Sequence, residues 1–323
     1  MQIAPLAPQE FTRPIAVITG GWSQERDRSL LSGHTVADAL TDMGIKSTVL
    51  DLDGTRGELL GGLGGAELAF LAIAGRGAED GRLQGLLETL GIPFTGSGVL
   101  ASAVGMHKPH AKQVVAAAGV RVLEGVLLGA GDGTEREAAR ITSTLGLPVI
   151  VKPVAEGGSI GVELAVSSEA LTDAVKASGG LLMAERFVAG RSVSVGVLED
   201  RHGALHVLPV LEALTPDRIY SYAAKRGTTA CDYQCPAQLD ASVLDDLRYQ
   251  AGAAHQALGC WAYSRHDFIV DDAGRAWWLE VNTLPGLSRT GNLARMAEAD
   301  GLTYEQLILH ILRGARVDRR AQA

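Results

Sequence analysis

The sequence predicts a small parallel α/β unit at the N-terminus, followed by an α+β region built from antiparallel strands. Within residues 1–105, the apolar runs PIAVITGG, KSTVLDLD and ELAFLAIAG alternate with helical or glycine-rich connections, a pattern typical of parallel strands. From residue 106 onward, short strand-like runs follow one another with few helices between them, which favours antiparallel pairing. A chain of 323 residues also exceeds one typical core, so two or three domains are expected.

In the first unit, a helix follows the glycine turn of PIAVITGG. Ser23 is the candidate cap of this helix, and an apolar stripe at helical spacing continues through Leu30, Leu31, Val36, Ala37 and Leu40.

A second unit begins near residue 106, where Pro109 opens a helix and Gly119 closes it. The strand-like runs are LPVIVKP, GVELAV, LLMAERF, SVSVGVL and ALHVLPV. The polar segment at about 218–236 has no sustained period, and a loop of that length is often a lid. Helices are expected near 241–258 and 303–313, on either side of a hairpin.

Composition narrows the class of protein. Hydrophobic residues at 46% and charged residues at 20% are typical of a globular, soluble chain, and the net charge of −8 argues against nucleic acid or an anionic membrane as partner. The N-terminus has no secretory pattern and no apolar run reaches the length of a membrane span. Three cysteines without a C-x-x-C pair fit a reducing cytoplasm.

The hairpin HDFIVDDAGRAWWLEVNTLPG, residues 266–286, carries the clearest chemical signal. If the chain turns about Ala273–Gly274, Asp267 lies opposite Glu280, and Asn282 shares a face with Glu280. Two opposed carboxylates destabilise a bare hairpin, so a cation is expected to compensate them. Three oxygen ligands that leave room for phosphate oxygens are typical of Mg²⁺ sites.

The segment VIVKPVAEGGSIGVE predicts a phosphate-binding loop. Lys152 ends a strand, and Glu156, Gly157, Gly158 and Ser159 follow in a turn whose backbone N–H groups could surround phosphate oxygens. A plain hairpin turn is the alternative interpretation.

Other charged residues have both a functional and an ordinary interpretation. Lys108 and Lys225 are candidate phosphate contacts or solvated surface groups. Arg265 shares the face of Asp267 and could pair with the acids or stabilise an oxyanion. Glu25 could favour the helix dipole or bind an amine at the end of a parallel strand, and Glu79-Asp80-Gly81 could be a simple turn.

Taken together, the sequence resembles the D-alanine–D-alanine ligase family of the ATP-grasp superfamily over nearly its whole length. The resemblance rests on seven ordered segments: GGWSQERDRSLLSG, GRGAEDGRLQGLLETLGIPFTGSG, HKPHAKQVVAAAGV, LPVIVKPVAEGGSIGV, YSYAAK, ALGCWAYSRHDFIV and LEVNTLPG. It implies an ATP-grasp fold, with a first-substrate domain at 1–105, a central lobe at 106–187, and a C-terminal lobe at 188–323 that carries the metal hairpin and the lid. The two lobes would clamp ATP.

The resemblance also implies a role for each matching residue. Lys108 and Lys152 would contact the ATP phosphates, Glu185 would lie near adenine, and Glu156, Gly157, Gly158 and Lys225 would complete the nucleotide site. Asp267, Glu280 and Asn282 would hold two Mg²⁺ ions, with Mn²⁺ as a substitute. Glu25 would bind the ammonium group of the first amino acid. Arg265 and the backbone N–H of Gly286 would stabilise the tetrahedral intermediate, with Ser159 and Lys225 closing the site. A cytoplasmic homodimer acting on small amino acids is expected.

The sequence departs from the family pattern mainly around the second substrate. Ala74 replaces a histidine, Arg226 replaces a tyrosine, and Gly291 replaces a serine that contacts the acceptor carboxylate. Ser288 and Arg289 lie in the same rewritten segment, where an arginine could supply the missing carboxylate contact. Two further departures lie at the nucleotide: Ser192 replaces a glutamate near the ribose, and His107 replaces the acid before Lys108.

Four interpretations stay open. The first is a carboxylate–amine ligase that forms an acylphosphate and uses an altered acceptor, as in specialised metabolism. The second is a housekeeping D-alanine–D-alanine ligase of peptidoglycan synthesis with drifted contacts. The third is a nucleotide-binding protein without turnover, and the fourth is a simple carboxylate kinase that forms an acylphosphate and incorporates no amine.

Overall fold

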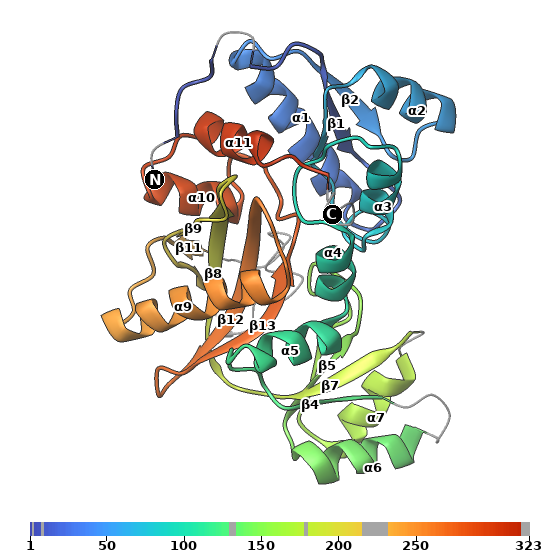
Figure 1. The fold of residues 1–323 in the computed structure, drawn as a ribbon. Helices are drawn as coiled ribbons and strands as arrows, with labels where there is room; N and C mark the ends of the chain where they lie inside the picture. The colour runs from blue at the N-terminus through green and yellow to red at the C-terminus, as the bar shows by residue number, and fades with distance from the viewer. Residues whose placement is uncertain (2, 8–9, 129–133, 178–179, 215–231, 318–323) are drawn as a thin grey trace.

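The computed structural model describes residues 1, 3–7, 10–128, 134–177, 180–214 and 232–317. Figure 1 shows an elongated molecule with the N-terminal unit at one end, the central lobe at the other, and a larger sheet between them. The predicted order, a parallel sheet followed by two antiparallel sheets, is confirmed.

The N-terminal sheet has the order β2-β1-β3 with both pairs parallel. Its strands are β1 (Ile15–Thr19), β2 (Ser47–Asp51) and β3 (Ala69–Leu71), and its helices are α1 (Arg26–Asp42), α2 (Arg56–Gly65) and α3 (Arg82–Thr89). β1 is buried along its whole length, as its unbroken apolar run predicts for the centre of a parallel sheet.

The predicted cap of α1 was wrong. Glu25 holds the N-cap position, and Ser23 Oγ instead accepts a hydrogen bond from Glu25 N–H at 3.2 Å. The same hydroxyl donates to the carbonyl of Ala74 at 3.1 Å. Ser23 therefore ties the loop before α1 to the loop after β3, and this tertiary contact replaces a local cap.

The central lobe is a four-stranded antiparallel sheet of order β4-β7-β5-β6. Its strands are β4 (Gly125–Leu127), β5 (Val149–Pro153), β6 (Glu163–Ala165) and β7 (Leu182–Arg186), with α6 (Thr134–Leu145) and α7 (Ser168–Ala177) packed on them. The core of this lobe contains Ile141, Val149, Leu171 and Leu182, so the lobe has its own buried centre.

The C-terminal sheet has the order β11-β10-β8-β12-β13, with β9 beside β8. Its strands are β8 (Gly190–Glu199), β9 (Leu205–Val207), β10 (Leu211–Leu214), β11 (Asp232–Gln234), β12 (Tyr263–Asp271) and β13 (Ala276–Asn282), and α9 (Ala241–Ala257) packs on it. The predicted loop at 218–236 lies mostly outside the described residues. Its end forms β11, which pairs with β10.

Two pairs of helices pack with a unit other than the one that holds their neighbours in sequence. Helix α4 (Val99–Met106), at the end of the proposed first domain, and helix α5 (Lys108–Ala117), at the start of the proposed central lobe, contribute Ala101, Ala111 and Val115 to the core under the C-terminal sheet. The last helices, α10 (Asn292–Ala299) and α11 (Tyr304–Arg313), share one core with the N-terminal unit. Figure 1 shows α11 beside α1 and α5 between the two antiparallel sheets.

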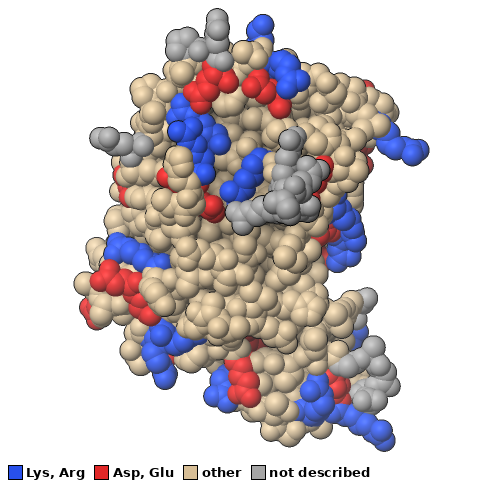
Figure 2. All heavy atoms as spheres, viewed as in Figure 1, with Lys and Arg blue, Asp and Glu red and all other residues tan. Residues whose placement is uncertain are grey.

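The surface carries charges of both signs. Figure 2 shows lysine and arginine side chains next to aspartate and glutamate side chains in small groups on one face. Among the helices of the described residues, none combines the length and apolarity needed to cross a bilayer.

Candidate active site

The hairpin β12–β13 has the predicted pairing at the acids. Asp267 lies opposite Glu280, and Arg265 lies opposite Asn282. The register shifts after Asp267, so that Phe268 lies opposite Trp278 and Leu279 is the extra residue of a bulge. The bulge lies next to the acids, where such irregularities often re-aim a side chain.

Protein cations already compensate the two opposed carboxylates. Arg265 donates two hydrogen bonds to Asp267, from Nε at 2.8 Å and from Nη2 at 2.9 Å, and Ser194 Oγ donates a third at 2.7 Å. Lys108 Nζ lies 3.3 Å from Oε2 of Glu280. The opposed charges alone therefore do not require a metal ion, contrary to the reasoning from sequence.

The donor set nevertheless fits a divalent ion together with a nucleotide. Within the described residues, no group of three or more His, Cys, Asp and Glu side chains forms a metal site by itself. Asp267 and Glu280 supply carboxylate oxygens, and Asn282 Oδ1 is oriented by the backbone N–H of Leu284 at 2.9 Å. Mg²⁺ commonly binds one or two carboxylates and completes its octahedron with phosphate oxygens and water.

A chain of hydrogen bonds lies on the opposite face of the hairpin. Trp278 Nε1 can only donate, so Nδ1 of His266 accepts at 3.1 Å and Nε2 of His266 carries the proton. His266 then donates to Ser264 Oγ at 2.9 Å, Ser264 donates to Nδ1 of His255 at 2.7 Å, and His255 donates to Glu199 at 3.1 Å. Burial, followed by His255, lowers the pKa of His266 to about 3, which keeps its imidazole neutral.

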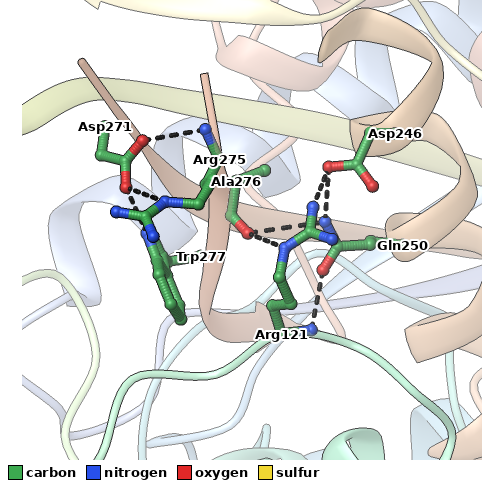
Figure 3. Close-up of polar contacts among 7 residues, drawn as sticks. All are labelled: Arg121, Asp246, Gln250, Asp271, Arg275, Ala276 and Trp277. Carbon is green, nitrogen blue, oxygen red and sulfur yellow. Dashed lines mark hydrogen bonds and ion pairs between the residues drawn. The ribbon is translucent and has the colours of Figure 1, made fainter. Parts of the chain in front are cut away.

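Figure 3 shows how the turn of the hairpin is anchored. Asp271 accepts hydrogen bonds from the backbone and side chain of Arg275 and from Trp277 Nε1. Arg121, after α5, donates to the carbonyl of Ala276 at 3.2 Å and pairs with Asp246 of α9. These contacts hold the strands that carry the acids against α9 and against the segment that follows α5.

The predicted glycine loop follows β5, and its backbone passes through the left-handed region. Gly158, Ser159 and Gly161 all have positive φ angles, of 63°, 62° and 68°. Ser159 is one of two described non-glycine residues in this left-handed region, where strain often marks a functional position. Glu156 pairs with Arg76 at 2.6 Å, and its carbonyl accepts from Lys108 Nζ at 2.5 Å.

Two more buried lysines, Lys152 and Lys112, meet at Glu185 on β7, and the sequence did not indicate Lys112. Lys152 Nζ lies 2.7 Å from Oε2 of Glu185, and Lys112 Nζ lies 2.5 Å from Oε1. Although the Lys112 ammonium is close, it is poorly aligned, and Oε1 accepts no aligned hydrogen bond among the described residues. Burial alone would raise the pKa of Glu185, but Lys112 and Lys152 outweigh it and lower that pKa. Burial lowers the pKa of Lys112 to about 8.

Two cavities meet at Lys108, Glu156 and Glu280. The first, of about 140 Å³, lies between the two antiparallel sheets and is lined by apolar side chains together with Lys152, Ser159, Glu185, Ser192 and Asp267. The second, of about 270 Å³, lies toward the N-terminal unit. The apolar walls of the first cavity suit a flat apolar ring. Phosphates that extend from there toward the second cavity would meet the cations and carboxylates of the junction.

The second cavity collects most of the residues that sequence reasoning assigned to amino-acid substrates. It is lined by Glu25, Ala74, Gly157, Gly158, Arg265, Gly286, Ser288 and Gly291, and also by Glu79 and Arg28. The Ala74 backbone is fixed by Ser23 and Ser29, so its methyl group occupies a defined place in the wall. Gly291 is the N-cap of α10, and its N–H donates to the carbonyl of Ser288 at 2.9 Å.

Glu79 is buried in this wall and accepts a hydrogen bond from the backbone N–H of Gly75. Burial, followed by the nearby charge of Glu25, raises the pKa of Glu79 to about 8. The sequence EDG indicated a turn, and Gly81 does cap α3, but the burial of Glu79 depends on packing between distant segments.

Arg289 does not reach the cavity. Its guanidinium pairs with Glu305 at 2.7 Å and Asp42 at 3.5 Å, and lies 4.5 Å from the ring centre of Tyr304. This position is contrary to the prediction that Arg289 replaces a carboxylate contact. Lys225 and Arg226 lie outside the described residues. His107 caps α5 through Nδ1, at 3.3 Å from His110 N, and so serves the helix in place of the family's acid.

Lys112 has one signal in the sequence that could have revealed it. It follows Lys108 by four residues, so both lysines lie on one face of the helix opened by Pro109. The buried carboxylate between Lys112 and Lys152 could not be read from spacing.

Comparisons with known proteins agree with this geometry. A family model described as the D-ala D-ala ligase C-terminus matches residues 114–313. A D-alanine–D-alanine ligase from Geobacter sulfurreducens is 38% identical over 311 residues, which cover 95% of each chain. One from Trichlorobacter lovleyi is 40% identical and covers 92% of this chain and 93% of the relative.

Two solved structures are similar over almost the whole fold. The D-alanine–D-alanine ligase from Bacillus anthracis complexed with ATP has a TM-score of 0.80 and 25% identity, and the match covers 94% of this chain and 97% of that one. The VanG D-Ala:D-Ser ligase from Enterococcus faecalis has a TM-score of 0.77 and 25% identity, covering 94% and 99%. The chain therefore belongs to the D-alanine–D-alanine ligase family, the ADP-forming carbon–nitrogen ligases of the ATP-grasp superfamily.

Proposed function

We propose that this ATP-dependent ligase joins D-alanine, as the first amino acid, to a second amino acid that is larger than D-alanine. The observation that carries the ligase chemistry is the junction of the two cavities at Lys108, Glu156 and Glu280. A candidate nucleotide cavity and a candidate amino-acid cavity meet there, beside a cluster of cations and carboxylates. D-alanine is the first amino acid in the names of both solved relatives, which differ in the second.

The proposed reaction has two steps. A carboxylate oxygen of the first amino acid attacks the γ-phosphorus of ATP, the bond to the bridging oxygen of ADP breaks, and an acylphosphate forms. The neutral amine of the second amino acid then attacks the acyl carbon, a proton leaves the nitrogen, and phosphate departs with the electron pair of the broken C–O bond. Activation is needed because a carboxylate and an amine do not condense usefully in water.

Each site residue has a place in this scheme. Lys108 and Lys152 would neutralise phosphate charge, and Glu185 would contact the adenine ring. Glu25 would hold the ammonium group of the first amino acid. Arg265 and the Gly286 N–H would stabilise the oxyanion, and loss of one such donor typically costs about 10²–10³ in turnover. Divalent metal, which would be two Mg²⁺ ions on the family pattern, would be held by Asp267, Glu280 and Asn282. When bound, the metal would spread the charge of the phosphoryl group.

The altered acceptor is supported by the wall of the second cavity. Ala74 and Gly291 both line it, and each is smaller than the histidine or serine expected from the family pattern. Removing both side chains widens the cavity and deletes a hydroxyl that would contact a carboxylate. Ser288 and the N-terminus of α10 remain as acceptor-side groups, since helix N-termini favour anions.

The test is ADP release by the purified protein with Mg²⁺ and ATP, with every product identified by mass. D-alanine alone should give little ADP, whereas D-alanine with a larger D-amino acid should give ADP and a mixed dipeptide. Efficient formation of D-alanyl-D-alanine would instead favour the housekeeping function, which the names of the curated relatives support. The homodimer and the cytoplasmic location stay predictions from the family resemblance.

A further inference from the structure

Helix α5 places two lysines between the sheets that enclose the proposed nucleotide cavity. Lys108 contacts the central lobe through the carbonyl of Glu156 and the C-terminal sheet through Glu280. One turn later, Lys112 repeats this arrangement, because its ammonium contacts Glu185 on β7 and donates to the carbonyl of Trp278 on β13 at 3.0 Å. Each lysine therefore bridges both sheets.

The two lysines differ in what else they can reach. Lys108 lines both cavities, whereas Lys112 is absent from the described residues that line them. Lys112 is 6% exposed, and its ammonium also lies 5.7 Å from the ring centre of Trp278. It can therefore act on a bound nucleotide only through its neighbours.

Its main neighbour is Glu185, which is 2% exposed and shared between two ammonium groups. Lys112 faces one carboxylate oxygen, and Lys152, which lines the nucleotide cavity, faces the other. Two lysines and one glutamate give this trio a net charge of +1. Without Lys112, the whole carboxylate charge would fall on Lys152, and the trio would present no net charge to phosphate.

We propose that Lys112 is a positioning residue for nucleotide binding, which balances Glu185 from behind so that the charge of Lys152 remains available to the phosphates. Its bond to the Trp278 carbonyl fixes this arrangement relative to β13, two residues before Glu280. The inference rests on the proposed nucleotide site.

The first measurement is the calorimetric Kd of ADP with Mg²⁺, and separately of ADP without metal, for the wild type, K112M and K112R. Because one charge near the phosphates is lost, K112M should bind ADP about tenfold or more weakly, while K112R should remain within about threefold of the wild type. K176M is the matched control, since Lys176 of α7 is exposed and pairs with an exposed Glu135. If the wild type fails to bind ADP, the proposed nucleotide site itself is wrong.

The second measurement compares K112M/E185Q with E185Q, so that any contact of Glu185 with adenine is lost from both proteins. Because Lys152 has no carboxylate to balance in either variant, the two should bind ADP within about threefold of each other, which a purely structural role for Lys112 would not produce. If K112M does not fold because Glu185 is left under-compensated, this pair provides the test by itself. ADP binding by folded K112M equal to that of the wild type, or a double variant that binds ADP about tenfold more weakly than E185Q, would overturn the proposal.

Discussion

Gly157 and Glu25, which lie on different units of the fold, are close enough to leave no room for a side chain between them. A Cβ at Gly157 would lie 2.8 Å from Oε2 of Glu25, and one at Gly158 would lie 3.3 Å from Oε1. The glycine loop of the central lobe thus forms one wall against the carboxylate proposed to bind the first amino acid. The loop proposed to face the phosphates also limits where that carboxylate can lie.

Gly157→Ala should therefore affect the first amino acid more than the fold. The new methyl group meets the end of a flexible side chain, so Glu25 can move, but it then leaves its place in the cavity wall. We expect KM for the first amino acid to rise about tenfold, with Tm within about 2 °C of the wild type. Steady-state kinetics at saturating ATP measure this.

Gly61→Ala is the control for that variant, because Gly61 lies in α2 with open space around its Cβ position. It should leave KM unchanged. An unchanged KM in Gly157→Ala as well would show that the contact with Glu25 does not position the amino acid.

Glu79 should make the stability of the protein depend on pH. In the unfolded chain this carboxyl ionises near pH ~4.3, whereas burial raises its pKa to about 8 in the folded protein. Between these values the folded state binds a proton that the unfolded state has released, so stability falls as pH rises through this window. Glu79→Gln removes the effect and keeps an oxygen for the Gly75 N–H.

Thermal unfolding at pH 5 and pH 8.5 tests this. The wild type and Glu79→Gln should have similar Tm values at pH 5, and the Tm of Glu79→Gln should be higher by about 2 °C or more at pH 8.5. Glu298→Gln, at an exposed position of α10, is the control, and its Tm difference from the wild type should be the same at both pH values. A constant Tm difference across this range would mean that Glu79 ionises normally.

Ser264, on β12, connects the two buried histidines His255 and His266. Ser264→Ala would leave His266 Nε2–H and His255 Nδ1 without this partner, and an unsatisfied buried polar group costs about 1–3 kcal/mol. Urea denaturation should show a loss of stability in that range. Ser143→Ala, at an exposed position of α6, should change stability by less than about 0.5 kcal/mol, and an equal effect in both variants would argue against the hydrogen-bond chain.

Sequence reasoning succeeded where one strong local rule decides the outcome. The alternation of faces along a strand, together with a clear turn at Gly274, was enough to pair Asp267 with Glu280. The bulge at Leu279 was not predicted, because an extra residue leaves no compositional signal in the sequence. The position of Arg289 was not predicted either, because its partners Asp42 and Glu305 come from distant segments.

The candidate site was predictable residue by residue but not as a set of interactions. Lysines and carboxylates could be assigned from motifs, whereas the pairing of Lys112 and Lys152 with Glu185 depends on how α5, β5 and β7 pack. Burial decides the charge state of Glu79, and burial arises from tertiary packing. Motifs therefore named the candidate ligands, whereas the groups that position them could be identified only from the structure.

Gly291 offers the most direct test of acceptor choice. Gly291→Ser places a Cβ 3.1 Å from the carbonyl oxygen of Ser288 and 3.2 Å from the Ser288 hydroxyl. The loop must therefore shift by a few tenths of an ångström. The added hydroxyl narrows the cavity and supplies a donor for an acceptor carboxylate, and a hydrogen bond to a charged group contributes about 1.5–3 kcal/mol. We expect kcat/KM for D-alanine as acceptor to rise about tenfold relative to the best larger acceptor.

Competition between D-alanine and the larger acceptor, with both dipeptides quantified by mass, measures that ratio directly. Gly64→Ser in α2 is the control, because its Cβ position is open and Gly64 does not line the cavity. An unchanged ratio in folded Gly291→Ser would place acceptor recognition elsewhere in the wall. A ratio that also shifts in Ala74→His would identify the two small residues as joint determinants, because both line the same cavity and both enlarge it.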